Sequence, residues 1–369
     1  MRHFAIRSIA GTAACLLALA GAACGNSDIP SDPSATTGAG GAGGAGAPVP
    51  GDAVKAAIKD RTPEDPTLIW TPSSVVLVPK EIAPSVYAVY PDDAPVKNEA
   101  GIPVATSGGF IVGDNGVLVI ESMINRKLAK QMIALVREVT SKPILYVLNT
   151  SYHGDHSYGN QFFPKGVLFI QHVETQNYIQ QHFAADVAFM MTNFGKNQGL
   201  EELEPQPAQI LLNDGANVDL DLGGRSVNVL HLGFAQTNGD LFVWLPKEKI
   251  VFTGNPIISE GPSLPWLLDG KIEAALVTLH KLLDMLPPDA IVVPGHGEPT
   301  GVAAIAHSIA YLEELKMRAA DAVAQGLTEK ETVDLLTETM KQYAAYKIYP
   351  WVHSQINVPK TYEELKTAP

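Results

Sequence analysis

The sequence predicts an α/β fold, an αββα sandwich in which two layers of sheet lie between two layers of helix. Short apolar runs of strand length precede segments with helical spacing of apolar residues, and this layout occurs twice along the chain. Each half also ends in a strand that runs into a polar, glycine-containing turn, at 149–160 and at 294–297. The strand ends of both halves would then meet at one edge of the sandwich, where α/β folds usually bind ligands.

The first half begins with a predicted β-meander, because short apolar runs are separated by Pro, Gly, Asp and Asn turns. These runs are 75–78, 86–89, 109–112 and 116–120. A helix is expected at 125–139 with Asn125 as its N-cap, followed by a strand at 143–148. A further strand at 167–170 leads into a helix at 172–191, whose His172 and His182 are expected to face solvent.

The second half repeats this order. Strands are predicted at 218–222, 227–230, 241–244 and 250–252, a helix at 271–285 and a strand at 290–293. Helices follow at 302–324 and 328–342, the second with a capping box of Thr328 and Glu331.

The tail at 343–369 is rich in aromatic residues and is expected to pack onto the domain as a C-terminal arm. The alternative is that its aromatic side chains line a pocket; these are Tyr346, Tyr349, Trp351 and His353.

The chain begins with the features of an export signal. Residues 1–23 carry two arginines, an apolar run too short to span a bilayer, and then small residues up to Cys24. The residues before Cys24 resemble a bacterial lipobox, so we expect a lipid anchor there, with simple secretion as the alternative. The Gly-, Ala- and Pro-rich stretch 24–70 is expected to form a flexible tether. The folded part would comprise a domain at 71–301 and a helical extension at 302–369, located in the periplasm or outer envelope.

Charge and cysteine content narrow the chemistry. Both cysteines, Cys15 and Cys24, lie at or before the cleavage region, so the mature domain has no thiolate for metal binding or catalysis. Without residues 1–23 the chain keeps 24 basic and 39 acidic side chains, a formal charge of −15. This charge argues against nucleic acid or an anionic membrane as partner. The expected partner is a small-molecule substrate, with membrane contact only through the possible anchor at Cys24.

The stretch 149–160 supplies the first candidate site. It contains the sequence HGDH at 153–156, directly after a buried strand. Imidazole nitrogens and carboxylate oxygens are ligands that Zn²⁺ accepts, whereas Mg²⁺ and Ca²⁺ prefer oxygen alone. A zinc site is the first hypothesis, and a polar loop with two surface histidines is the alternative.

Four stretches together resemble the metallo-β-lactamase superfamily: 149–160, QTNGD at 236–240, FTGN at 252–255 and PGHG at 294–297. The resemblance runs from about residue 75 to residue 301. It implies an αββα sandwich with one or two metal ions at its edge. Members of this family hydrolyse lactams, thioesters, lactones and phosphoesters, or carry out redox chemistry.

Three positions depart from the family pattern. Ser151 and Gln236 stand where the family has histidines of its first metal site, and Asn255 stands where it has a bridging aspartate. Of the first-site ligands only His153 remains. Since neutral Ser and Gln are poor zinc ligands, we expect this first site to be empty or very weak.

The resemblance leaves the second site intact, with Asp155, His156 and His296 as ligands. Water or the carbonyl oxygen of Asn255 would complete a tetrahedron, so one zinc ion per chain is expected. Asp155 and His153 are the predicted catalytic residues: Asp155 holds the ion, and His153, no longer needed as a ligand, is the candidate general base.

Weaker expectations concern the surroundings. Glu121 should anchor the site through hydrogen bonds, and His231 should have a structural role. Tyr152 and Tyr158 are equally compatible with packing and with donation to an oxyanion. The sequence therefore favours an exported metal-dependent hydrolase of an ester, lactone or amide. The alternatives are a non-catalytic binding protein with the same fold and a redox variant with non-haem iron.

Overall fold

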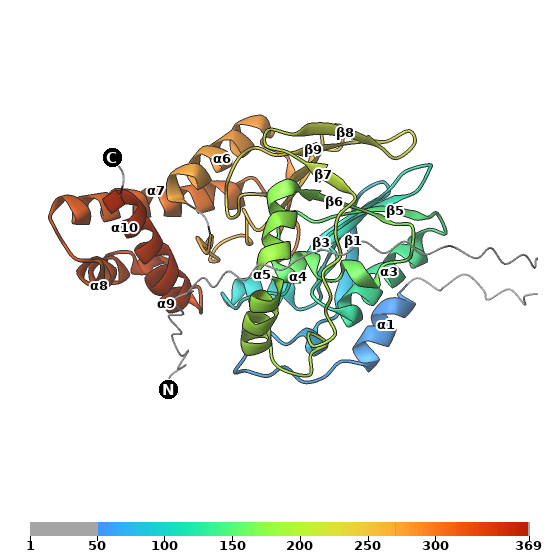
Figure 1. Ribbon diagram of the computed structural model, residues 1–369, viewed down its shortest axis with the longest axis horizontal. Coiled ribbons are helices and arrows are strands. Elements are labelled where there is room, and N and C mark those ends of the chain that lie inside the picture. Colours follow the sequence, from blue (N-terminus) through green and yellow to red (C-terminus); the bar gives the residue numbers. More distant parts are fainter. Residues whose placement is uncertain (1–50, 270, 368–369) are drawn as a thin grey trace, which may run out of the picture. The chain divides into compact units, whose positions relative to one another are not determined.

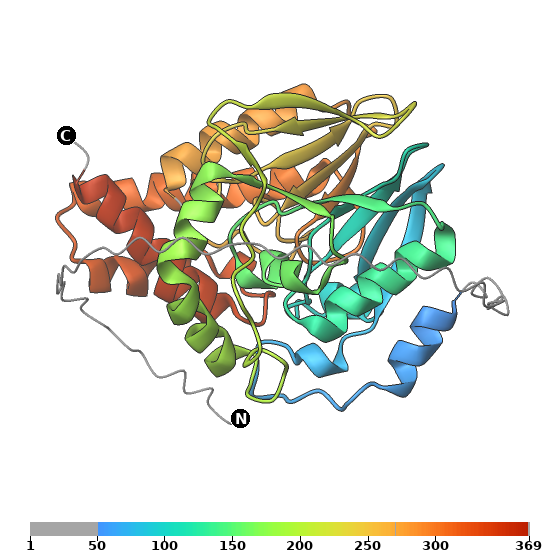
Figure 2. The same cartoon turned by 45° about the vertical axis from the view of Figure 1, so that its right-hand side comes forward.

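Two β-sheets face one another, and helices cover the outer surface of each (Figures 1 and 2). The computed structural model describes residues 51–269 and 271–367. The first sheet has seven strands in chain order, antiparallel from β1 to β4 and parallel from β4 to β7. They are β1 (Leu77–Ala83), β2 (Val86–Pro91), β3 (Gly108–Val112), β4 (Val117–Ile120), β5 (Ile144–Leu148), β6 (Leu168–His172) and β7 (Ile210–Leu212).

The second sheet has six strands in the order β13-β12-β11-β10-β9-β8. Only the β11–β12 pair among these described strands is parallel. The strands are β8 (Asn217–Asp221), β9 (Ser226–Leu230), β10 (Phe242–Leu245), β11 (Ile250–Gly254), β12 (Ile291–Pro294) and β13 (Thr300–Gly301). Because β5 and β12 are both followed by polar turns, their carboxyl ends set the position of the site.

Alternation along the strands divides the apolar core into layers. In β4, Leu118 and Ile120 pack between the sheets with Phe252 of the second sheet, whereas Val117 and Val119 pack toward the helices. Successive side chains of a strand point to opposite faces, so an all-apolar strand is buried on both sides. This arrangement confirms the predicted αββα sandwich.

Four long helices form the outer layers. They are α3 (Arg126–Val139) and α5 (Val173–Asn193) beside the first sheet, and α6 (Ile272–Met285) and α7 (Ala303–Ala324) beside the second. As predicted, the Asn125 side chain caps α3 by accepting the backbone N–H of Leu128 at 2.9 Å.

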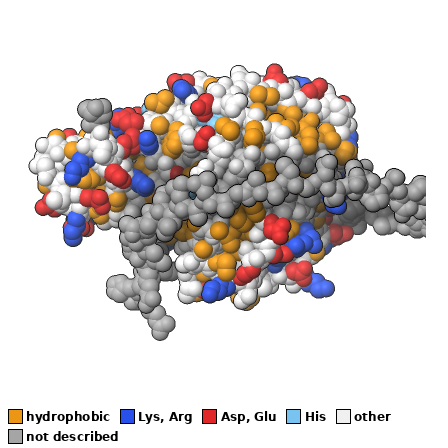
Figure 3. All heavy atoms as spheres, viewed as in Figure 1, with side chains coloured by type: hydrophobic (Ala, Val, Ile, Leu, Met, Phe, Trp, Pro, Cys, Tyr) orange, Lys and Arg blue, Asp and Glu red, His pale blue; other side chains and the backbone are white. Residues whose placement is uncertain are grey.

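The shorter elements complete the chain. They are α1 (Asp52–Lys59), η1 (Pro72–Ser74), α2 (Ala94–Glu99), α4 (Gly154–Ser157), η2 (Asn160–Phe162), α8 (Glu329–Thr339), η3 (Lys341–Tyr343), α9 (Tyr349–Trp351), the π-helix η4 (Val352–Asn357) and α10 (Val358–Thr367). The predicted capping box of Thr328 and Glu331 is present at the start of α8. In Figure 1 the red helices α8, α9 and α10 lie near the end of α7. On the face shown in Figure 3, exposed acidic and basic side chains are interspersed.

The tail from residue 343 packs onto the domain as predicted. Tyr346, Tyr349 and His353 are buried, and the hydroxyl of Tyr311 in α7 lies 2.9 Å from Nδ1 of His353. Asn357 ties this arm to the loop before α6: it accepts the N–H of Leu267 at 2.8 Å and donates to the carbonyl of Pro265 at 2.8 Å.

The predicted tether ends earlier than residue 70. The predicted signal peptide, Cys24 and residues up to 50 lie outside the described residues. Residues 52–59 form α1, and the Glu138 carboxylate holds the start of this helix through the N–H groups of Gly51 and Ala53. Trp70 is 2% exposed and packs on Phe194, with 4.6 Å between ring centroids. The Gly-rich composition stops near residue 51, and the apolar residues after it find partners in the core. No helix in the described part of the chain is long and apolar enough to cross a membrane.

Candidate metal centre

Asp155, His156 and His296 meet where β5 and β12 end. Asp155 and His156 lie on the short helix α4 after β5, and His296 follows β12. Oδ2 of Asp155 lies 3.5 Å from Nε2 of each histidine, and the two Nε2 atoms are 3.4 Å apart. Two ligands about 2.0–2.1 Å from a tetrahedral zinc ion lie about 3.3–3.4 Å apart. The three atoms therefore have the spacing of one face of a zinc tetrahedron.

The outer nitrogens of both histidines face oxygen acceptors. Nδ1 of His296 lies 2.9 Å from the carbonyl oxygen of Val104, and Nδ1 of His156 lies 3.0 Å from Oε1 of Glu121. Since a carbonyl can only accept, Nδ1 of His296 carries the proton and its Nε2 lone pair is directed at the cluster, and the nearby Glu121 carboxylate favours a proton on Nδ1 of His156. Thr106 donates to Oδ2 of Asp155 at 2.5 Å. Glu121 thus has the anchoring position expected from the sequence.

The charges of the three residues are coupled. Burial disfavours a charged His156 ring, but Asp155 and Glu121 outweigh it and raise the pKa of His156 to about 9. Burial lowers the pKa of His296 to about 4. Burial opposes ionisation of Asp155, yet the two histidines lower its pKa. At neutral pH and without a metal ion, these shifts favour an additional proton on His156, which a bound zinc ion would displace from Nε2.

Asn255 presents a neutral oxygen to the same cluster. Its side chain is 2% exposed, and Oδ1 has no hydrogen-bond partner among the described residues. Asn255 lies close enough to His156 to raise the pKa of that ring. A side chain at Gly295 would collide with this Oδ1, which accounts for the glycine in the turn before His296. The amide oxygen is therefore available as a fourth ligand.

His153 lies beside the cluster, and its ring nitrogens contact Asn255 and Asp269, not the three ligand atoms. Its Nδ1 accepts a hydrogen bond from Nδ2 of Asn255 at 2.9 Å, so the proton is on Nε2, which lies 3.5 Å from Oδ2 of Asp269. Burial opposes the ionisation of Asp269, but hydrogen bonds from His153 and Tyr152 lower its pKa. Sequence analysis missed Asp269, because it lies in a loop without a recognisable motif.

The positions of the first site do not form a group of ligands. The hydroxyl of Ser151 and both polar atoms of the Gln236 side chain are buried without hydrogen-bond partners among the described residues. The ring nitrogens of His153 contact Asn255 and Asp269, not Ser151 or Gln236. These atoms offer no charge to offset that of a second cation.

A second cluster in the described residues also has ligand spacing and consists of His172, Asp214 and His231. Its two imidazole rings carry their protons on the other nitrogen than the rings of the first cluster. The expectation that His172 faces solvent is wrong: it is buried and stacks on His231 with 4.4 Å between ring centroids, whereas His182 is exposed as expected. Nδ1 of His172 accepts the N–H of Glu174 at 3.2 Å as the cap of α5, and Nδ1 of His231 accepts the N–H of Gly215 at 3.0 Å.

Those backbone contacts place the protons on Nε2 of both rings. Neither Nε2 then has a lone pair for a metal unless a backbone hydrogen bond breaks. The role of His172 and His231 is therefore structural, in contrast to that of His156 and His296.

An open cavity of about 220 Å³ lies over the metal cluster. Its apolar wall consists of Trp70, Phe189, Met190, Phe194, Trp266 and Trp351. Trp351 comes from the C-terminal arm, so this residue lines the pocket, as in the alternative considered for the tail. The hydroxyl of Tyr158 donates to Asp186 at 2.9 Å, and the Tyr152 ring stacks on Tyr178 with 3.6 Å between ring centroids. Both tyrosines are therefore held by contacts with their neighbours.

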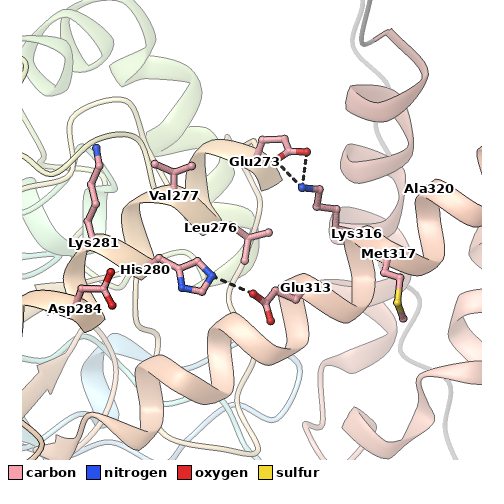
Figure 4. A pocket seen from close by; sticks show the side chains of 10 residues that line it. All are labelled: Glu273, Leu276, Val277, His280, Lys281, Asp284, Glu313, Lys316, Met317 and Ala320. Carbon is pink, nitrogen blue, oxygen red and sulfur yellow. Dashed lines mark hydrogen bonds and ion pairs between the residues drawn. The ribbon is translucent and has the colours of Figure 1, made fainter.

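A larger hollow, of about 640 Å³, lies between α6 and α7 (Figure 4). Figure 4 shows His280 directed at Glu313, 3.0 Å away, and Lys316 paired with Glu273 at 2.7 Å. None of the metal-cluster residues lines it. It is a surface groove in which His280 and Lys316 each face a carboxylate, and it shares no lining residue with the cavity over the cluster.

The Asp240→Ala variant is expected to lose roughly 3 kcal/mol or more of unfolding free energy, because each buried donor left unpaired costs about 1–3 kcal/mol. The Asp240 carboxylate accepts the N–H groups of Ala235, Gln236 and Thr237 at 3.2, 2.7 and 2.8 Å and so holds the turn of Gln236. Urea unfolding measures the effect. The control is Asp221→Ala, which removes one exposed turn acceptor and should cost less than about 1 kcal/mol. Equal losses in the two variants would contradict this account.

Comparison with known proteins agrees with the geometry. A family model described as "Metallo-beta-lactamase superfamily" matches residues 101–296. The chain is 25% identical over 206 residues to a metallo-beta-lactamase type 2 of Bacteroides fragilis, covering 56% of this chain and 74% of that protein. It is 22% identical over 215 residues to a metallo-beta-lactamase type 2 of Bacillus cereus, covering 58% and 75% of the two chains.

Two solved structures share the fold. A metallo-beta-lactamase from Pontibacter korlensis superposes with a TM-score of 0.50 at 16% identity, over 64% of this chain and 99% of that one. The inverting sec-alkylsulfatase Pisa1 from Pseudomonas sp. superposes with a TM-score of 0.62 at 16% identity, over 78% of this chain and 50% of that one. At such identities the likeness shows the common fold.

Proposed function

This chain belongs to the metallo-β-lactamase superfamily, and from that premise we propose that it is a hydrolase that uses one zinc ion to cleave an ester, lactone or amide. One observation carries the proposal: three ligand atoms lie 3.4–3.5 Å apart at the edge of the sandwich, and Nδ1 of each imidazole faces an oxygen, which leaves Nε2 to the metal. Asp155, His156 and His296 would hold the ion, and a water molecule or the amide oxygen of Asn255 would take the fourth position, which must pass to the water for catalysis.

Zinc bound there would supply a Lewis acid that polarises a carbonyl oxygen and lowers the pKa of a water molecule. The chain's own residues position and deprotonate the nucleophile. Asp269 holds the Nε2–H of His153, so Nδ1 is the basic nitrogen. Nδ1 receives the amide of Asn255 in this structure, and the attacking water must take the place of that amide to deliver its proton. His153 would return this proton to the leaving group.

A second candidate is a binding protein that has kept the fold and the metal but lost catalysis. The buried, unpartnered atoms of Ser151 and Gln236 favour it, because a complete two-metal site would have charged or metal-bound groups at these positions. The two candidates differ in turnover and not in metal content.

The test is turnover by the purified protein with one equivalent of zinc, over a panel of esters, lactones, amides and β-lactams. We expect hydrolysis of at least one substrate, lost on treatment with a chelator and restored by zinc. His280→Ala, which removes a surface histidine of the α6–α7 groove, is the matched control and should behave as the unaltered protein. Rates equal to the uncatalysed background on every substrate would support the binding protein instead.

We also propose that the protein is exported, on the strength of residues 1–23 and the residues before Cys24. Fractionation of bacterial cells that express the full chain tests this separately, and recovery in the cytoplasm alone would contradict it.

A further inference from the structure

We propose that the substrate carries a positive charge beside an apolar body, and that the cavity disfavours anionic substrates. This inference rests on the proposed function in so far as it names the substrate of the same site. It is drawn from the walls of the cavity and from the carboxylates of Asp186 and Asp269 at its edge.

Aromatic rings extend from the metal cluster to the opening. The Trp266 ring stacks on His296 with 6.1 Å between centroids, and Trp351 meets Trp266 edge to face at 5.4 Å and 76°. Phe189 on α5 remains 49% exposed across from them. Aromatic faces of this kind bind apolar groups and also attract cations, most strongly when the rings are tryptophan.

The charged side chains that line the cavity are carboxylates, apart from its two histidines. They are Asp155, Asp186 and Asp269, and the described lining contains no Lys or Arg. Lys360 on α10 lies close enough to act on Asp269 but does not line the cavity. The hydroxyls of Tyr158 and Tyr178 donate to the two oxygens of Asp186, at 2.9 and 3.2 Å, although burial raises its pKa.

The summed charge of the carboxylates at the cluster and the cavity remains negative when a divalent metal ion is included. Asp155 and Glu121, which flank His156, match the two charges of such an ion. Asp269, whose side chain is 40% exposed, and Asp186 then remain in excess. A substrate anion would face these carboxylates in a partly dry cavity, whereas an ammonium group would gain from them and from the tryptophan faces.

The test uses three 4-nitrophenyl phenylacetates whose para substituent is trimethylammonium, tert-butyl or sulfonate. The first two groups are nearly isosteric, so they differ mainly in charge. With zinc-loaded protein, kcat/KM divided by the rate with hydroxide should fall in the order ammonium, tert-butyl, sulfonate, by at least about ten-fold from first to last. Equal values, or preference for the sulfonate, would overturn the inference and leave the hydrolase proposal standing.

Substitutions test whether Asp186 and Asp269 cause the preference for the ammonium substrate. Asp269→Asn and Asp186→Asn should each lower the ammonium-to-sulfonate ratio several-fold, whatever happens to the absolute rates. Asp284→Asn removes the same charge from the α6–α7 groove and should leave the ratio unchanged. Asp284 does not line the cavity, so solvent and salt screen its charge from the substrate. An equal fall of the ratio in Asp284→Asn would place the effect in the net charge of the protein and refute the role of the cavity.

A binding measurement separates this inference from the proposed function. Quenching of tryptophan fluorescence reports binding of the three corresponding para-substituted benzyl alcohols, which have no bond to hydrolyse. Tighter binding of the ammonium compound, lost in Asp269→Asn, supports the inference even if no ester is cleaved. Equal affinities for the three alcohols in the unaltered protein would contradict it.

Discussion

Replacement of His296 by alanine is expected to reduce bound zinc from one ion per chain to none and to abolish hydrolysis. The variant keeps Asp155, His156 and the weak neutral oxygen of Asn255, and a site that loses one of its three principal ligands loses most of its affinity. The loss should exceed about 100-fold, since even partners outside the coordination shell are worth about 10–100-fold. Metal analysis after dialysis gives the stoichiometry, and competition with a chromophoric chelator gives the affinity.

Ser151→Ala is the control for this result, because its buried hydroxyl stands at a first-site position and has no partner among the described residues. It should keep one zinc ion. The reciprocal variant combines Ser151→His, Gln236→His and Asn255→Asp, and should raise the stoichiometry to two by restoring the family ligands. Two tightly bound ions in the unaltered protein would refute the argument from these three positions.

Replacement of His153 by alanine should keep the metal and cut turnover by about 10²- to 10⁴-fold, the range for a positioned general base. His153 is outside the ligand group, and its basic Nδ1 lies beside Asn255 at the cluster. Steady-state kinetics on the best substrate of the panel, with metal content measured in the same samples, checks both halves of the statement.

Asp269→Asn supplies a graded comparison, since it removes the charge that holds the Nε2–H of His153 but leaves the ring in place. Its turnover should fall less than that of His153→Ala, with zinc retained. Loss of zinc from His153→Ala would instead make His153 a ligand, and unchanged turnover would remove it from the mechanism.

The sequence predicts most of the fold and the ligand group, for reasons that the structure makes clear. Strands such as β4 are apolar on both faces because they lie in the middle of a sandwich, so their pattern is strong. Asp155, His156 and His296 follow β5 and β12, one from each sheet, and the family resemblance, together with the polar turns after these two strands, pointed to them as one group.

Other parts of the site could not be found in this way. Asp269 and Asp186 come from a loop and the middle of a helix, and only tertiary packing brings them to one cavity. The three-residue strand β7 was missed because two of its residues are half exposed and the third is exposed. His172 was misjudged because helical spacing alone does not reveal that a histidine acts as an N-cap.

The contacts of Asn357 impose an order on the assembly of the site during synthesis. The chain leaves the ribosome from its N-terminus, so Asp155, His156 and His296 are all available before the last helices exist. The loop of Trp266 and Asp269 gains its anchor only when Asn357 emerges. A chain synthesised only as far as His296 would therefore already contain the three candidate ligands but would lack the contacts that hold the loop of Trp266 and Asp269.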